Sequence, residues 1–207
     1  MGAAADPPSP LGPSCGVRRP TSETGKGGCS IHPPNVTGDD PPRAPSAEVA
    51  VRAERVGDND AIRRVNEAAF GRIDEAGIVD ALRAAGALPI SLVAELDGAI
   101  VGHLAMSPIT IDGIDDGSLG LAPMAVLPSR QRRGVGGALV RAGLAICRAR
   151  RIPLVVVLGH AAYYPRFGFV PAAPAGLRWI GGHDASFFAT GALRRGVVRY
   201  RPEIGDG

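Results

Sequence analysis

Cysteine is scarce in this chain of 207 residues. The three cysteines are Cys15, Cys29 and Cys147, and none belongs to a Cys-x-x-Cys pair or to a Cys/His spacing typical of metal ligands. The sequence therefore predicts neither a zinc site nor a disulfide framework. We expect no bound metal. Cys147 stands among apolar residues of a predicted helix and is interpreted as a buried structural thiol rather than a nucleophile.

Aromatic residues and long apolar runs are also lacking. Aromatics make up 4% of the chain and the formal net charge is only +3, which argues against nucleic-acid binding but suits an anionic small ligand. No apolar run reaches the roughly 18 residues of a membrane span. The opening MGAAADPPSP has neither the charged nor the apolar region of a signal peptide. We expect a cytoplasmic protein with no membrane or nucleic-acid partner.

The first 46 residues differ in composition from the rest. They contain ten of the 19 prolines and very few leucines, isoleucines, valines or aromatics. Such a segment buries too little apolar surface to offset the entropy cost of ordering it. We therefore expect a disordered Pro/Gly-rich tail over residues 1–46 and one folded domain over residues 47–207.

Apolar periodicity predicts the elements of the folded part. In chain order these are a strand in 47–55, helices over about 58–70 and 74–85, a hairpin turning at Asp97–Gly98, a strand over 119–128, a helix over 135–150, a buried strand over 152–159, a short helix in HAAYYPRFGFV and final strands after Trp179. The apolar stripe of the 135–150 helix is predicted to contain Val135, Leu139, Ala142, Ile146 and Ala149. This order predicts a single α/β (α+β) domain with a mixed sheet.

A glycine-rich turn, QRRGVGG from Gln131 to Gly137, joins the predicted strand and helix. Backbone N–H groups at a helix N-terminus attract anions, and glycines let the backbone approach a bulky phosphate. The turn is not a Walker A loop, because no Gly-Lys-Ser/Thr occurs, and Leu139 breaks the dinucleotide pattern G-x-G-x-x-G. By itself the turn is either a phosphate cradle or a solvated arginine turn.

Two motifs together resemble the GNAT N-acetyltransferase superfamily, and most closely its YhbS-type group of bacterial acetyltransferases. Gln131, Gly134 and Gly136 match Q-x-x-G-x-G after a strand, and Tyr164 stands four residues before Gly168-Phe169 after the next strand. The resemblance covers residues 48–200. It implies a central sheet that is splayed at a site for acetyl-CoA and flanked by helices.

The resemblance also implies roles for individual residues. Acetyl-CoA would be the acetyl donor, and the acceptor would be an amine of a small molecule or peptide. Tyr164 would act as the general acid for the leaving thiolate. The implied cofactor-binding residues are Met124, Ala125, Val126, Gln131, Arg132, Arg133, Gly134, Val135, Gly136 and Gly137. Arg132 or Arg133 would reach the adenosine 3′-phosphate, and a homodimer is possible because family members are often dimers.

Other assignments stay open. Glu67, Glu95 and His103 are candidates for the base that deprotonates the amine, and His160 either contacts the cofactor or caps the short helix. The segment FFATGAL has Thr190 and Gly191 where related sequences often carry an apolar-Glu pair. Two consequences stay open, namely an altered acceptor pocket and a weakened last strand, because glycine is a poor strand residue. Two alternatives to an enzyme remain, namely a non-catalytic acyl-CoA-binding or sensor module of the same fold and an arginine-rich nucleic-acid binder.

Overall fold

The protein is described here from a computed structural model. The structure describes residues 48–71, 74–182 and 186–204. The expected tail over residues 1–46 lies outside these residues. In the described part, no helix is long and apolar enough to cross a membrane.

Within the described residues, seven strands form a mixed sheet in the order β1-β2-β3-β5-β6-β9-β7. The bounds are Ala50–Ala53 for β1, Ile90–Leu96 for β2, Ala99–Pro108 for β3, Leu119–Val126 for β5, Leu154–Leu158 for β6, Val170–Pro171 for β7 and Phe187–Gly191 for β9. The β5–β6 pair is parallel, whereas the other neighbours in this sheet are antiparallel. A smaller sheet contains β4 (Thr110–Ile111), β10 (Gly196–Arg199) and β8 (Leu177–Trp179).

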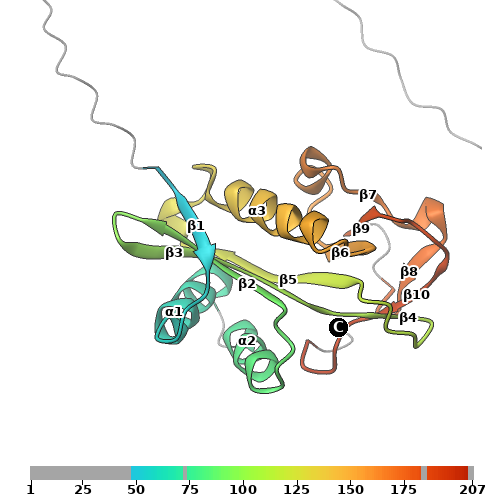
Figure 1. Cartoon of the computed structure of the whole chain (residues 1–207). Coiled ribbons are helices and arrows are strands. Elements are labelled where there is room, and N and C mark those ends of the chain that lie inside the picture. The colour runs from blue at the N-terminus through green and yellow to red at the C-terminus, as the bar shows by residue number, and fades with distance from the viewer. Residues whose placement is uncertain (1–47, 72–73, 183–185, 205–207) are drawn as a thin grey trace, which may run out of the picture. The chain divides into compact units, whose positions relative to one another are not determined.

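Three α-helices cover the two faces of the main sheet in the described part of the chain (Figure 1). Helices α1 (Asn59–Phe70) and α2 (Asp74–Ala84) lie on one face, and α3 (Val135–Ala149) lies on the other. Short 3-10 turns complete the fold: η1 at Pro128–Arg130, η2 at Tyr164–Phe167 and η3 at Ala173–Ala175. The α/β class and the mixed sheet expected from the sequence are confirmed.

The buried face of α3 is rotated relative to the predicted stripe. The residues buried on it are Val135, Leu139, Val140, Gly143, Leu144 and Cys147. Ala149, which the stripe included, is exposed, so that part of the prediction is wrong. Gly143 explains the rotation in part: a Cβ there would lie 2.8 Å from the Cε of Met106, so the helix approaches β3 through this glycine.

Gly191 is the last residue of strand β9 and does not prevent this strand from forming. Strand β9 forms and pairs with β6 from Leu154↔Gly191 to Leu158↔Phe187. Gly191 has a φ of 111°, and a Cβ at this position would collide with the carbonyl oxygen of Pro153. Glycine is therefore needed here for close backbone approach.

Candidate active site

The parallel strands β5 and β6 pair over only a short stretch, because β6 ends soon after the pairing begins. Their register runs only from Leu119↔Val155 to Leu121↔Val157, although β5 continues to Val126. Pro123 lies beyond the part of β5 that pairs with β6 and has no backbone N–H to donate. Buried backbone groups normally find partners, so the part of β5 that extends past the end of β6 at Leu158 offers hydrogen bonds to a ligand. The splay expected from the sequence stays a prediction.

A cavity of about 860 Å³ lies at this opening. Strand β5 contributes one wall, and the loop after β6 contributes another. The residues that line it are Ala69, Phe70, Ile78, Leu121, Ala122, Pro123, Met124, Val126, Gln131, Arg132, Gly136, Leu158, Gly159, His160, Tyr163, Tyr164 and Ile204. They include residues of α1 and α2, which cover one face of the sheet, and Gly136 of α3, which covers the other.

The glycine-rich turn borders one end of the cavity. The side-chain amide Nε2 of Gln131 donates to the carbonyl oxygen of Val126 at 3.1 Å, which ties the turn to the end of β5. Gly134 begins α3 with a φ of 86°, a conformation that L side chains rarely adopt. A Cβ at Gly136 would lie 2.7 Å from the Oη of Tyr163. The first turn of α3 is thus bare backbone, which suits close contact with an anion.

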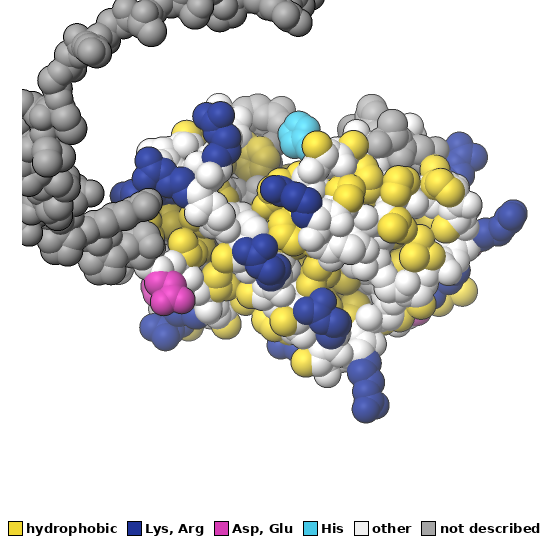
Figure 2. Space-filling model, turned by 90° about the horizontal axis from the view of Figure 1, so that it is seen from above, with side chains coloured by type: hydrophobic (Ala, Val, Ile, Leu, Met, Phe, Trp, Pro, Cys, Tyr) yellow, Lys and Arg dark blue, Asp and Glu magenta, His cyan; other side chains and the backbone are white. Residues whose placement is uncertain are grey.

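A second hollow of about 430 Å³ lies beside the first and shares three lining residues with it. Its lining residues are Arg132, Gly134, Gly136, Gly137, Arg141, Tyr163, Arg166 and Phe167. The guanidinium of Arg166 lies 4.4 Å from the ring centre of Tyr163, and that of Arg141 lies 5.9 Å from that of Phe167. No described lining residue is acidic. Basic side chains are spread over this side of the molecule, where acidic ones are few (Figure 2).

Tyr164 is the buried tyrosine of the site. Its ring packs against the backbone of Gly159, where any Cβ would collide with it, and it lies edge-on to Phe169 at 5.6 Å between ring centres. Burial raises the pKa of Tyr164 to about 12, with a smaller contribution from Tyr163. Its hydroxyl is therefore protonated at neutral pH. Among the described residues, no hydrogen-bond partner is found for this hydroxyl, although Tyr164 lines the cavity.

The structure brings most of the predicted site residues together. Six of them line the first cavity, namely Met124, Val126, Gln131, Arg132, Gly136 and Tyr164. Two more, Gly134 and Gly137, line the second hollow. Ala125 and Val135 are buried and line neither, and Arg133 is exposed and lines neither. Of the two arginines considered for a phosphate, Arg132 is therefore the one beside both hollows.

The three candidate bases lie outside the cavity lining. Glu95 pairs with Arg52 on β1, and Glu67 lies 3.9 Å from Arg63 on the surface of α1. His103 is fully buried on β3. His160, which had been assigned to the cofactor or to a helix cap, is exposed and lines the cavity. Its carbonyl oxygen accepts the N–H of Tyr163, which fixes the turn after β6.

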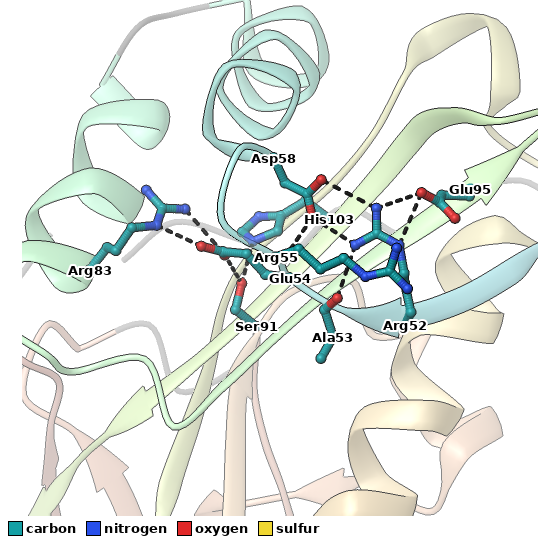
Figure 3. A network of polar contacts seen from close by, with 9 residues as sticks. All are labelled: Arg52, Ala53, Glu54, Arg55, Asp58, Arg83, Ser91, Glu95 and His103. Atoms are coloured by element: carbon teal, nitrogen blue, oxygen red, sulfur yellow. Dashed lines mark hydrogen bonds and ion pairs between the residues drawn. The ribbon is translucent and has the colours of Figure 1, made fainter.

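His103 belongs to a polar network between α1, α2 and the first strands (Figure 3). Its Nδ1 lies 3.2 Å from the Nδ2 of Asn66, and its Nε2 lies 3.0 Å from the Oγ of Ser91. The hydroxyl of Ser91 donates to Glu54, whose carboxylate also accepts from Arg83. Burial lowers the pKa of His103 to about 4, so this histidine is neutral and structural at pH 7.

Cys147 is buried, as expected, with its Sγ 3.5 Å from the Sδ of Met106. Burial raises the pKa of its thiol to about 11, which keeps it protonated and unreactive. No group of His, Cys, Asp and Glu side chains in the described part of the chain is arranged to hold a metal ion.

Sequence reasoning missed two parts of the site. The first part is a set of apolar side chains that line the cavity although they are far from the motifs in the chain: Ala69, Phe70, Ile78 and Ile204. Tyr163, next to the motif tyrosine, lines both hollows with its hydroxyl over Gly136. The pair of adjacent tyrosines, Tyr163 and Tyr164, was the only feature of the local sequence that indicated a second aromatic residue at the site. The sequence does not show which of the two rings faces which hollow.

A cavity along the unpaired part of β5, next to a glycine-rich helix start, is the kind of site that suits an extended phosphorylated ligand. Comparison with known proteins defines the family. Residues 89–171 match the family model described as acetyltransferase (GNAT) domain. The chain belongs to the GNAT acetyltransferase family.

The relatives found are bacterial. The chain is 45% identical to the uncharacterized N-acetyltransferase YjhQ of Escherichia coli K12, over 54% of this chain and 64% of YjhQ. It is 40% identical to the uncharacterized N-acetyltransferase YhbS of the same strain, over 54% of this chain and 68% of YhbS. The aligned part thus spans about two thirds of these curated relatives. The YhbS-type resemblance expected from the sequence is confirmed.

Two solved structures are similar over most of the described chain. A GNAT family acetyltransferase from Brucella melitensis, solved in complex with acetyl-CoA, is 41% identical with a TM-score of 0.67, and the match covers 76% of this chain and 99% of that one. YhbS from Escherichia coli, solved in complex with CoA, is 32% identical with a TM-score of 0.74, and the match covers 78% and 94%.

Proposed function

We propose that this protein is an acetyl-CoA-dependent N-acetyltransferase that moves the acetyl group directly to an amine of a small molecule or peptide. The observation that carries the proposal is one cavity that is lined by the glycine-rich turn, by the unpaired part of β5 and by Tyr164. The acetyl-CoA and CoA held by the two similar structures support this choice of donor.

The residues of the cavity fit an extended thioester donor. The backbone of Met124 and the N–H of Val126, beyond the part of β5 that pairs with β6, would pair with the pantetheine amides in the manner of an added strand. The N–H groups of the turn and of the first turn of α3 would hold the pyrophosphate, assisted by Arg132. Arg141 and Arg166 line the neighbouring hollow and are the side chains we assign to the adenosine 3′-phosphate.

Direct transfer requires two proton movements. The amine nitrogen forms a bond to the thioester carbonyl carbon, the carbon–sulfur bond breaks, and the leaving thiolate takes the proton of the Tyr164 hydroxyl. The proton lost by the amine passes to His160, the one candidate histidine or carboxylate among the described residues that lines the cavity. The backbone near Val126 would stabilise the negative charge that develops on the thioester oxygen. Solvent then restores both side chains.

Replacing Tyr164 by Phe tests the catalytic role. We expect turnover of an accepted amine to fall by about 100-fold, the lower range for loss of a general acid, while the Kd for acetyl-CoA measured by calorimetry stays unchanged. Tyr163→Phe is the matched control, because this hydroxyl lies over Gly136 at the phosphate end. Equal turnover in wild type and Tyr164→Phe would contradict the assignment. Acetyl-CoA binding without turnover of any amine in a broad panel would favour the sensor module.

A further inference from the structure

The large cavity has two chemically different ends. At the α3 end lie Gln131, Arg132 and Gly136, which offer amide, guanidinium and bare backbone. At the other end lie Ala69, Phe70 and Ile78 of α1 and α2, together with Ile204 after β10, and all of these are apolar. The two helices that supply this second end lie on the opposite face of the sheet from α3 (Figure 1).

This difference between the two ends indicates which end of the cavity holds the donor and which holds the acceptor. On the proposed function, on which this inference rests, the phosphates of the donor lie at α3 and its thioester lies near Tyr164. The part of the cavity lined by α1 and α2 is then left for the acceptor. Its amino group points toward Tyr164 and His160, and the rest of the molecule lies against Phe70, Ile78 and Ile204.

We propose that the acceptor is a monoamine whose amino group is carried on an apolar chain or ring. Phe70 is 39% exposed although it is a large apolar side chain, so an apolar ligand would cover surface that is now in water. A second ammonium group in this place would be desolvated without a partner, since no described lining residue carries a carboxylate and Arg132 carries positive charge. Polyamines and aminoglycosides are therefore disfavoured.

A matched pair of amines tests the proposal. Hexylamine and 1,6-diaminohexane have the same carbon chain and differ by a terminal ammonium. With acetyl-CoA as donor, we expect kcat/KM per amino group to be at least about ten-fold higher for hexylamine, because an apolar pocket separates such ligands by one to two orders of magnitude. Equal or higher kcat/KM for the diamine would overturn the proposal, as would acetylation of neither amine by protein that still binds acetyl-CoA.

A pair of variants sharpens the test. Ile78→Asp places a carboxylate in the apolar end, where it can pair with the second ammonium of the diamine. We expect the ratio of kcat/KM for hexylamine to kcat/KM for 1,6-diaminohexane to fall to about one-tenth of its wild-type value. Ala81→Asp, exposed on the same helix and outside the cavity lining, should leave it unchanged. An unchanged preference in Ile78→Asp would contradict the proposed acceptor end. Calorimetric binding of acetyl-CoA is measured for each protein; its absence from the wild type would remove the proposed function itself.

Discussion

The two sides of β5 are built differently. Toward β3, the ladder runs from Gly102↔Val126 to Pro108↔Leu119 and is interrupted only by an irregularity near Leu104. Toward β6, pairing ends after Leu121↔Val157. The side toward β3, called here the closed side, contains Leu104 and the polar network of His103, whereas the side toward β6, called the open side, carries the cavity. A single strand thus divides a region built for stability from a region that offers unpaired backbone to a ligand.

The largest expected effect falls on the closed side. Leu104→Ala removes a fully buried side chain of the core under α3 and should lower the free energy of unfolding by about 3 kcal/mol, within the range for cavity-forming substitutions. Urea denaturation measures this loss. The Kd for acetyl-CoA in the folded variant should stay within about two-fold of wild type, since Leu104 does not line the cavity. A loss of stability below 1 kcal/mol would show that the core repacks.

The next effect concerns pH and also belongs to the closed side. The pKa of His103 is about 4 in the folded protein against an ordinary value of 6.5, so the unfolded chain binds more protons between these values. The stabilisation that this neutral histidine gives is complete above pH 6.5 and is lost as the pH falls toward 4, by on the order of 3 kcal/mol. Denaturation at a series of pH values should therefore show a steeper fall for wild type than for His103→Asn. Identical slopes would mean that His103 is not held neutral, and exposed His160→Asn serves as the control.

On the open side, Gly136→Val should weaken binding without unfolding the protein. The added side chain would project toward the Tyr163 hydroxyl and fill the first turn of α3, where we place the pyrophosphate. Loss of charge-assisted hydrogen bonds there is expected to raise the Kd for acetyl-CoA by about 100-fold. Calorimetry measures the change, and Ala145→Val, exposed on the same helix, is the control. Wild-type affinity in Gly136→Val would place the phosphates elsewhere.

The smallest effect is expected at the second hollow. Arg166→Gln should raise the Kd for acetyl-CoA by about ten-fold through loss of one charged phosphate partner, but should change the Kd for acetyl-dephospho-CoA little. Exposed Arg148 lies outside both hollows, and Arg148→Gln should affect neither ligand. If Arg166→Gln weakens both ligands equally, this arginine does not contact the 3′-phosphate.

Much of the fold was predictable from local patterns. Helix α1, the hairpin at Asp97–Gly98 and the strand before the glycine-rich turn appear close to their expected bounds. Errors arose where tertiary contacts override local periodicity. The buried face of α3 is shifted because Gly143 lets the helix approach Met106, and glycine stands at the end of β9 because the chain at Gly191 passes close to Pro153.

The candidate site divides in the same way. Gln131, Gly134, Gly136 and Tyr164 form two short motifs, and the resemblance of these motifs to the GNAT superfamily implied an acetyl-CoA site and a class of reaction. The apolar end formed by Phe70, Ile78 and Ile204 comes from segments that are distant in sequence and meet only in the folded protein. The fold also decides that Glu95 and His103 lie away from the cavity, since Glu95 pairs with Arg52 and His103 with Ser91. Motif residues act through local backbone geometry, whereas the acceptor end depends on which side chains the packing of α1, α2 and the sheet brings together.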